Sequence, residues 1–222
     1  MSSSSVRVWD IFTRLFHWLL VAAIGVAWWS GEQGGEWMSW HLRAGYLVLG
    51  LVIFRVIWGF AGSHYARFGQ FLRSPASTLG YLKNMLKGRD DAHLGHNPAG
   101  GWGVIVLLLL CAVQAGTGLF ANDDIFTEGP LAYLVGYDLS IEITRWHKLM
   151  FNALLAMIAL HVLAVVYHQR FRKEAIVQAM ITGKKPVAGE LAGVTVNRSR
   201  EWLLGSTAVL ISAAAVWGLI SL

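Results

Sequence analysis

Cysteine is almost absent from this chain: Cys111 is the only one among 222 residues, and it falls in the middle of an apolar run. A single cysteine excludes a disulfide framework and a thiolate cluster for zinc or an iron–sulfur centre. The sequence also lacks C-x-x-C-H, which excludes covalently attached haem of the c type. Any bound metal centre must therefore be held by other side chains and by packing.

Charged residues are scarce as well, at 14% of the chain, whereas 55% of the residues are hydrophobic. This balance excludes an ordinary soluble domain. Five apolar runs have about 20 residues each, which is enough to cross a hydrocarbon core of about 30 Å. They are Thr13–Trp29, His41–Phe60, Gly103–Phe120, Ile143–Gln169 and Trp202–Ser221. The sequence therefore predicts an all-α membrane protein.

The distribution of charge between these runs predicts how the chain crosses the membrane. Basic residues gather between the second and third runs and after the fourth: Arg67, Arg73, Lys83, Lys87, Arg89, Arg170, Arg172, Lys173, Lys184, Lys185, Arg198 and Arg200. Acidic residues gather in the other two loops: Glu32, Glu36, Asp123, Asp124, Glu128, Asp138 and Glu142. Because Lys and Arg on short loops mark the cytoplasmic side, we expect a cytoplasmic N-terminus and a periplasmic C-terminus in a bacterial inner membrane. The net charge of +5 thus reflects topology and does not indicate nucleic-acid binding.

The first run is interpreted as a retained membrane anchor. Asp10 and Arg14 flank it, and no small-residue cleavage site follows its long apolar part, as a secretory signal would require.

The fourth run carries three histidines, His147, His161 and His168. His147 and His161 are fourteen residues apart, which in a helix is a rise of about 21 Å with a return to within roughly 40° of the same face. Ionisable side chains at membrane depth are costly and indicate a functional site. Two imidazoles on one face at two depths predict two metal centres.

Two further histidines offer partners for these centres. His17 lies in the first run and His41 opens the second. If successive helices alternate in direction, His41 shares a level with His147, and His17 shares a level with His161. Four histidines at two levels predict two bis-imidazole sites, the arrangement of a dihaem b-type cytochrome in a four-helix bundle.

Several neighbouring residues are candidates for contacts with such a cofactor. Arg14 lies one turn before His17 and is read equally well as a partner of a haem propionate or as a positive-inside anchor. Gly45 lies one turn after His41, where a small residue admits either a flat macrocycle or a neighbouring helix. Arg55 lies fourteen residues after His41, and because no span holds an acidic residue, a propionate is its expected partner. His168 is a ligand, a propionate or quinone contact, or an interfacial histidine.

The segments between the spans carry weaker patterns. Residues 74–88 begin with Ser-Pro and have apolar residues at helical spacing, which predicts a short amphipathic helix on the cytoplasmic surface. A similar helix is expected over residues 170–185, and another before a helix cap at Ser140. His93 and His96 are interpreted as loop histidines.

Taken in order, these motifs resemble the bacterial cytochrome b561 and Ni/Fe-hydrogenase b-type cytochrome family. The matching positions are His17-Trp18, His41 to Gly45, Arg55, Trp146-His147 and His161. Residues 6–175 carry the resemblance, and the stretches VWDIFTRLFHW, GSHYARF and GHNPAGG are similar to its cytochrome b/b6-domain branch.

The resemblance implies two non-covalent haem b groups, one held by His17 and His161 and the other by His41 and His147. It also implies electron transfer between the quinone pool and a redox partner, such as a periplasmic c-type cytochrome or an enzyme. The candidates that it adds for the propionates or the surface are Arg43, Arg145 and Lys148.

The expected organisation is a dihaem domain over residues 1–175, a cytoplasmic connection over 176–200, and an additional C-terminal span over 201–222. This fifth helix departs from the usual four and is either lipid-facing or involved in forming a homo-oligomer. The alternative functions are a superoxide:quinone oxidoreductase and the membrane anchor of a hydrogenase. A haem-free metal transporter would need histidines at one level with carboxylates beside them, and the spans contain no carboxylate.

Overall fold

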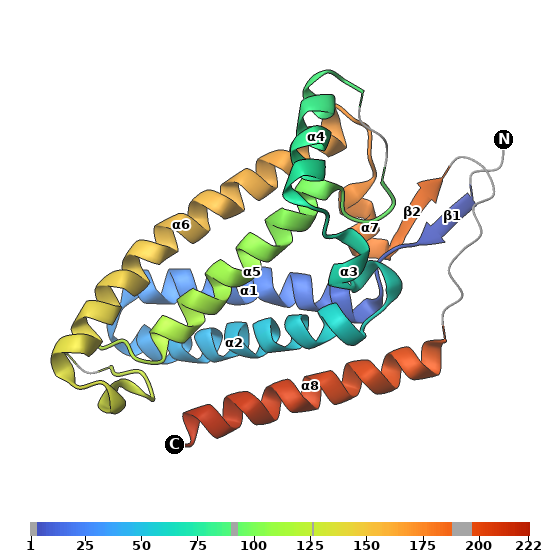
Figure 1. The fold of residues 1–222 in the computed structure, drawn as a ribbon. Coiled ribbons are helices and arrows are strands. Elements are labelled where there is room, and N and C mark those ends of the chain that lie inside the picture. The colour runs from blue at the N-terminus through green and yellow to red at the C-terminus, as the bar shows by residue number, and fades with distance from the viewer. Residues whose placement is uncertain (1–3, 90–92, 126, 188–196) are drawn as a thin grey trace. The chain divides into compact units, whose positions relative to one another are not determined.

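Long helices dominate the computed structural model, which describes residues 4–89, 93–125, 127–187 and 197–222 and is 77% helical. In these residues, five helices are long and apolar enough to cross a membrane (Figure 1). They are α1 (Ile11–Gln33), α2 (Met38–Ala61), α5 (Pro98–Gly118), α6 (Tyr137–Arg170) and α8 (Arg198–Ile220). All five predicted spans are confirmed as helices.

The chain divides into two compact units. Unit 1 comprises Met1–Leu15, Ile57–Val106 and Ala159–Ser206, and unit 2 comprises Phe16–Val56, Leu107–Ile158 and Thr207–Leu222. Each of the five long helices contributes one segment to each unit. Followed along the chain, α1 passes from unit 1 to unit 2, α2 passes back, and α5, α6 and α8 continue the alternation.

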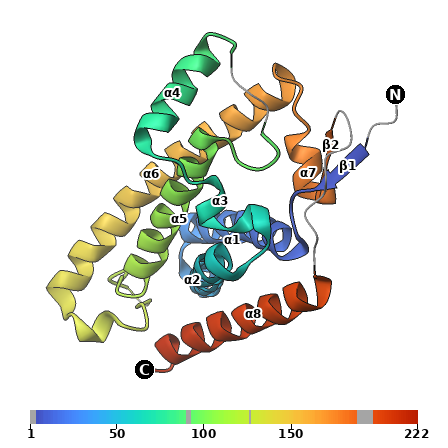
Figure 2. The same ribbon diagram turned by 45° about the vertical axis from the view of Figure 1, so that its right-hand side comes forward.

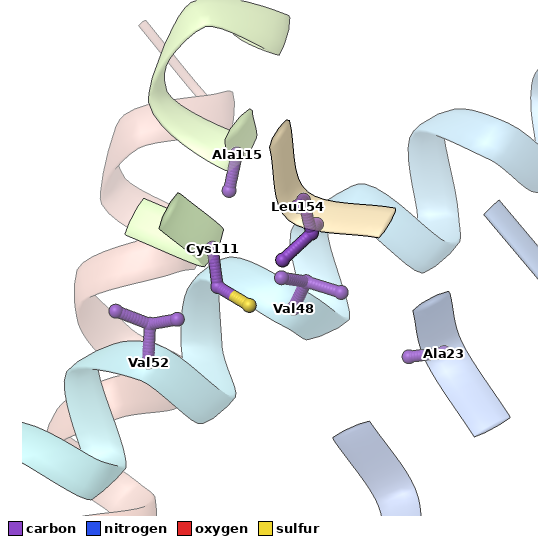
Figure 3. Packing of buried hydrophobic residues seen from close by; sticks show 6 residues of the cluster. All are labelled: Ala23, Val48, Val52, Cys111, Ala115 and Leu154. Carbon is purple, nitrogen blue, oxygen red and sulfur yellow. The ribbon is translucent and has the colours of Figure 1, made fainter. Parts of the chain in front are cut away.

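Unit 2 has a core of small and branched apolar side chains. Its buried members are Ala23, Val48, Val52, Cys111, Ala115 and Leu154, from α1, α2, α5 and α6 (Figure 3). Cys111 and Leu154 are almost completely buried, at 2% and 1% exposure. Cys111 therefore acts as a small apolar residue in the packing.

Unit 1 is organised around a buried carboxylate. Asp10 precedes α1 and is 1% exposed. One of its oxygens accepts a hydrogen bond from the backbone N–H of Thr13 at 2.8 Å, which caps the helix as expected. The other oxygen accepts from the hydroxyls of Thr13 and Ser63 and from the indole N–H of Trp58. Asp10 thus ties the start of α1 to the end of α2.

A two-stranded antiparallel sheet, which the sequence analysis missed, also belongs to unit 1. Strand β1 (Ser4–Arg7) pairs with β2 (Lys184–Val187), and α7 (Ile176–Thr182) lies beside β2 in both views (Figures 1 and 2). Trp9 and Val8, just after β1, pack against Ala179 of α7. The helix predicted over residues 170–185 is therefore shorter than expected and leads into a strand.

The remaining elements are short. They are η1 (Gly35–Trp37), η2 (His64–Ala66), α3 (Phe68–Phe71), α4 (Pro75–Leu86) and η3 (Ala132–Leu134). The predicted surface helix is confirmed as α4, with Ser74 accepting from the N–H of Ser77 and proline in the first turn. The predicted cap at Ser140 is wrong, because α6 already begins at Tyr137 and the Ser140 hydroxyl donates to the carbonyl of Phe120.

Candidate haem sites

His41 lies in the first turn of α2 and is held by α1, within unit 2. Its Nδ1 lies 2.8 Å from the carbonyl oxygen of Ala27. Because a carbonyl can only accept, Nδ1 carries the proton, and Nε2 keeps the lone pair that binds metals. The ring packs against Gly31, where an added Cβ would come within 2.8 Å of Nδ1. Glycine is thus required at position 31 for this placement of His41.

His147 lies on α6 and is held by two side chains of α5. Its Nδ1 lies 3.0 Å from the hydroxyl oxygen of Thr117, and that hydroxyl donates to the carbonyl of Val113 at 2.8 Å. The Thr117 oxygen therefore accepts from the Nδ1–H of His147. Both histidines consequently have the same tautomer, with the proton on Nδ1 and the lone pair on Nε2.

The two imidazole rings lie together in unit 2. Their centroids are 6.0 Å apart and their planes are at 78° to each other. An imidazole nitrogen lies about 2 Å from a bound first-row metal ion, so two rings on opposite sides of one ion have centroids about 6 Å apart. The spacing therefore fits one iron between His41 and His147.

The space and the polar groups around this pair can be tested against a haem. An added Cβ at Gly45 would meet no heavy atom within 4 Å, so there is room one turn from His41. The amide nitrogen of Gln114 lies 3.1 Å from Nε2 of His147, where a metal would bind. Its buried Oε1 has no hydrogen-bond partner among the described residues. A metal at Nε2 of His147 would replace the hydrogen bond from the Gln114 amide, whose own oxygen already lacks a partner. The residues present therefore fit a haem.

Comparison with known proteins agrees with this geometry. The family model described as prokaryotic cytochrome b561 matches residues 8–183. The chain belongs to this family. It is thus a multi-pass membrane protein of the b-type cytochromes, and the family implies haem b as its cofactor.

Several curated proteins are similar over most of their length. A probable Ni/Fe-hydrogenase B-type cytochrome subunit of Azotobacter vinelandii is 22% identical, over 81% of this chain and 88% of the relative. Proteins with the same description in Rhizobium leguminosarum bv. viciae and Bradyrhizobium diazoefficiens are each 24% identical, over 82% of this chain and 89% and 86% of the relatives. No solved structure matches the chain.

The second predicted pair of this cytochrome b561 chain is divided between the two units. His17 belongs to unit 2, where it is half-buried. Its ring centroid lies 4.9 Å from that of Trp18, with the two planes nearly perpendicular. His161 belongs to unit 1 and is exposed on α6. Their joint ligation of a haem stays a prediction.

The three basic candidates near the spans differ in their surroundings. Arg55 of α2 is buried, at 3% exposure. Arg14 is half-buried, and its guanidinium lies 3.4 Å from the carbonyl of Thr182. Arg145 is exposed and pairs with Glu142 at 3.0 Å. Of the three, Arg55 is the most deeply buried, and its contact with a propionate stays a prediction.

The two remaining basic candidates, Arg43 and Lys148, are exposed. Arg43 lies over the ring of Trp40, with its Cζ 5.4 Å from the ring centroid. Such a cation–π contact anchors an arginine at a surface. Roles for these two residues at a haem stay predictions.

His168 lies in a buried polar cluster of unit 1. Its Nδ1 contacts a carboxylate oxygen of Glu174 at 2.9 Å, and the other oxygen accepts from Lys185 at 3.0 Å. Lys185 also donates to the carbonyl of His93. Burial alone would raise the pKa of Glu174, but the hydrogen bonds from His168 and Lys185 and their charges outweigh burial and lower it. The cluster fastens β2 to the end of α6, which is a structural role for His168.

The sequence analysis missed the residues that orient the two paired histidines. Gln114 and Thr117 act through their side chains, and Ala27 acts through its backbone carbonyl. The available signal was the spacing of Gln114 and Thr117, which places both side chains on one face of an otherwise apolar helix.

Proposed function

We propose that this chain is a dihaem b-type cytochrome that carries electrons across the bacterial inner membrane between the quinone pool and a periplasmic redox partner. The observation that supports it most directly is the pair His41 and His147, with ring centroids 6.0 Å apart and the lone pair of each ring on Nε2. The second haem would be held by His17 and His161.

Haem iron supplies one-electron chemistry, cycling between the ferrous and ferric states. The protein's part is to hold the axial ligands rigidly and to keep a third ligand away. The hydrogen bonds from His41 to Ala27 and from His147 to Thr117 fix the tautomer and orientation of each ring, as partners of metal-binding histidines do. Histidine ligands from both His41 and His147 would favour electron transfer over oxygen binding at the group they hold.

The proposed direction across the membrane depends on the charge pattern. Basic loops mark the cytoplasmic side, so the N-terminus would be cytoplasmic and the C-terminus periplasmic. The acidic loops would then face the periplasm and attract a basic soluble partner. The family match over residues 8–183 supports a haem-binding region close to the proposed 1–175, followed by the connection 176–200 and the added span 201–222.

A second candidate function is the electron-transfer subunit of a hydrogenase. It is favoured by the descriptions of the similar proteins, which are all probable Ni/Fe-hydrogenase B-type cytochrome subunits. Purification from native membranes with nickel quantitation separates the two. Stoichiometric nickel in the complex would favour the hydrogenase subunit, and a nickel-free complex with a c-type cytochrome would favour the first function.

Haem quantitation with reduced-minus-oxidised spectra on the purified protein tests the haem assignment. We expect two b haems per chain, with one lost in His41→Ala and the other lost in His17→Ala. The matched control is His93→Ala, a loop histidine that should leave both haems. A protein without haem, or one whose haem content is indifferent to both substitutions, would contradict the proposal.

A further inference from the structure

A second pocket of the molecule lies entirely in unit 1, in a part of the chain that the proposed haem sites do not use. It has a volume of about 230 Å³, roughly that of eight water molecules in the liquid. Its walls come from the end of β1, the end of α2, the η2 turn and the first turns of α8. We call it the basic pocket because Arg7, His64, Arg67 and Arg200 line it.

The three arginines of this pocket outnumber its carboxylates, so its lining keeps a net positive charge. Its two acidic residues are Asp10 and Glu201. Asp10 is occupied by its hydrogen bonds from Thr13, Trp58 and Ser63, and Glu201 pairs with Arg7 at 2.5 Å. Within the described part of the chain, neither Arg67 nor Arg200 forms an ion pair. The pocket therefore presents guanidinium groups that can bind an external anion.

The groups around the pocket are well positioned. Glu201 is only 8% exposed, and it fixes the guanidinium of Arg7. The side-chain oxygen of Asn197 accepts from the backbone N–H of Arg200 at 3.0 Å and so caps the first turn of α8. Arg67 and Arg200 are exposed, and they are suited to phosphate because each guanidinium can donate two parallel hydrogen bonds to its oxygens.

The level of the pocket in the membrane indicates which kind of molecule carries the anion. Two membrane-spanning helices meet here at their ends, since α2 ends at Ala61 and α8 begins at Arg198. The ends of spans lie at the level of the lipid headgroups. Ala61 and Leu204 add apolar surface to the lining. A charged wall next to an apolar wall matches a lipid better than a fully hydrated ion.

We propose that the basic pocket binds the phosphate group of an anionic phospholipid headgroup. Arg67 and Arg200 bind the phosphate oxygens, and Arg7 adds charge while it stays paired with Glu201. This binding also gives a role to α8, which supplies one wall of the pocket, as a part of a lipid site.

The test uses the full chain, purified in an uncharged detergent and stripped of lipid. The midpoint of thermal unfolding is measured against increasing short-chain phosphatidylglycerol, short-chain phosphatidylcholine or inorganic phosphate. We expect phosphatidylglycerol to raise the midpoint at concentrations at which the other two have no effect. The assay does not depend on haem or on electron transfer, so it can fail while the proposed function holds.

The variant that tests the residues is Arg67→Gln with Arg200→Gln, and the matched control is Arg170→Gln with Lys173→Gln, two exposed basic residues of unit 1 outside the pocket. The lipid concentration for half the stabilisation should rise about tenfold in the pocket variant and stay unchanged in the control. If the glutamine variant does not fold, Arg67→Lys with Arg200→Lys replaces it. This variant keeps the charge but loses the paired donors of the guanidinium, so it should show an intermediate loss of lipid affinity.

Three results would overturn the proposal. Equal stabilisation by phosphatidylcholine would show that acyl chains, not phosphate charge, are bound. Equal losses in the pocket and control variants would show general electrostatic attraction. Equal protection by inorganic phosphate would assign the pocket to the free anion instead of a lipid.

Discussion

The two units of this cytochrome b561 chain are stabilised by different interactions. Unit 2 packs alanine, valine, leucine and one cysteine, and its paired histidines donate hydrogen bonds to a backbone carbonyl and to a threonine hydroxyl. Unit 1 is held by a buried aspartate with three side-chain partners and by buried ion pairs around Glu174 and Glu201. Both units bury polar side chains, but the buried carboxylates among the described residues, Asp10 and Glu201, both lie in unit 1.

The largest expected effect comes from the central carboxylate of unit 1. Asp10→Ala leaves the donors of Thr13, Trp58 and Ser63 without their acceptor and removes the cap of α1. We expect a loss of about 3 kcal/mol in the free energy of unfolding. Chemical unfolding in detergent, followed by circular dichroism, measures it. The control is Asp138→Ala, an exposed acidic residue in the first turn of α6, where about 0.5 kcal/mol is expected. Equal losses would refute the special role of Asp10.

The second effect concerns the few polar contacts of unit 2. Thr117→Val removes the acceptor for the Nδ1–H of His147 and so releases the ring orientation. Loss of such a partner typically lowers metal-site affinity about 10- to 100-fold. The rate of haem transfer to an excess of a haem-scavenging globin should rise accordingly, for one haem only. Thr207→Val, at an exposed threonine of α8, should leave the rate unchanged. A normal rate in the Thr117 variant would show that this hydrogen bond does not support the site.

A smaller effect is expected from packing against His41. Gly31→Ala would place a Cβ 2.8 Å from Nδ1, so the ring or helix α1 must shift, at a cost of about 1 kcal/mol. The spectrum and the midpoint potential of one haem should change. Gly25→Ala, on the same helix, meets no heavy atom within 4 Å and should leave both haems unaltered. Identical spectra for the two variants would place the haem away from His41.

The smallest effect is a pH dependence that belongs to unit 1. The pKa of Glu174 is lowered in the folded protein, so its contacts with His168 and Lys185 contribute stability above its ordinary value of 4.5. That contribution is lost as the pH falls through the lowered pKa. Thermal midpoints of the native protein and of Glu174→Gln should therefore differ at neutral pH and converge in strong acid. Glu142→Gln, which breaks only an exposed pair, should show almost no difference at any pH. A constant gap for Glu174→Gln would contradict the assignment.

Much of the architecture could be predicted from the sequence, because apolar runs of about 20 residues have few alternatives in a membrane. The expectation that His41 and His147 lie close together followed from helix geometry and alternating direction, and in the structure their ring centroids are 6.0 Å apart. Their joint ligation of a haem stays a prediction. The pairing of His17 with His161 rests on the same argument and stays a prediction. The roles of Thr117 and Ala27 could not be predicted, because they depend on the rotation of α5 and α1 against their neighbours.

The sheet escaped prediction for a different reason. The strands are four residues long, rich in serine and lysine, and without alternating polarity. The two strands pair only because the intervening helices bring these distant parts of the chain together, and no local sequence pattern predicts this. The cap prediction at Ser140 failed for a related reason. Serine suits a helix cap, but the Ser140 hydroxyl donates its hydrogen bond to the carbonyl of Phe120 instead.

The pairing of β1 with β2 also has a consequence for how the protein is made. Ser4 pairs with Val187, so the partner of the first strand is synthesised only after α1, α2, α5 and α6. During translation the N-terminal strand must wait with its hydrogen-bonding edge open while the helices insert. Contacts between positions so distant in sequence form late in folding, because closing the long loop costs conformational entropy before the contacts contribute any stabilisation. We therefore expect the small sheet to form as one of the last steps of folding, shortly before α8 enters the membrane.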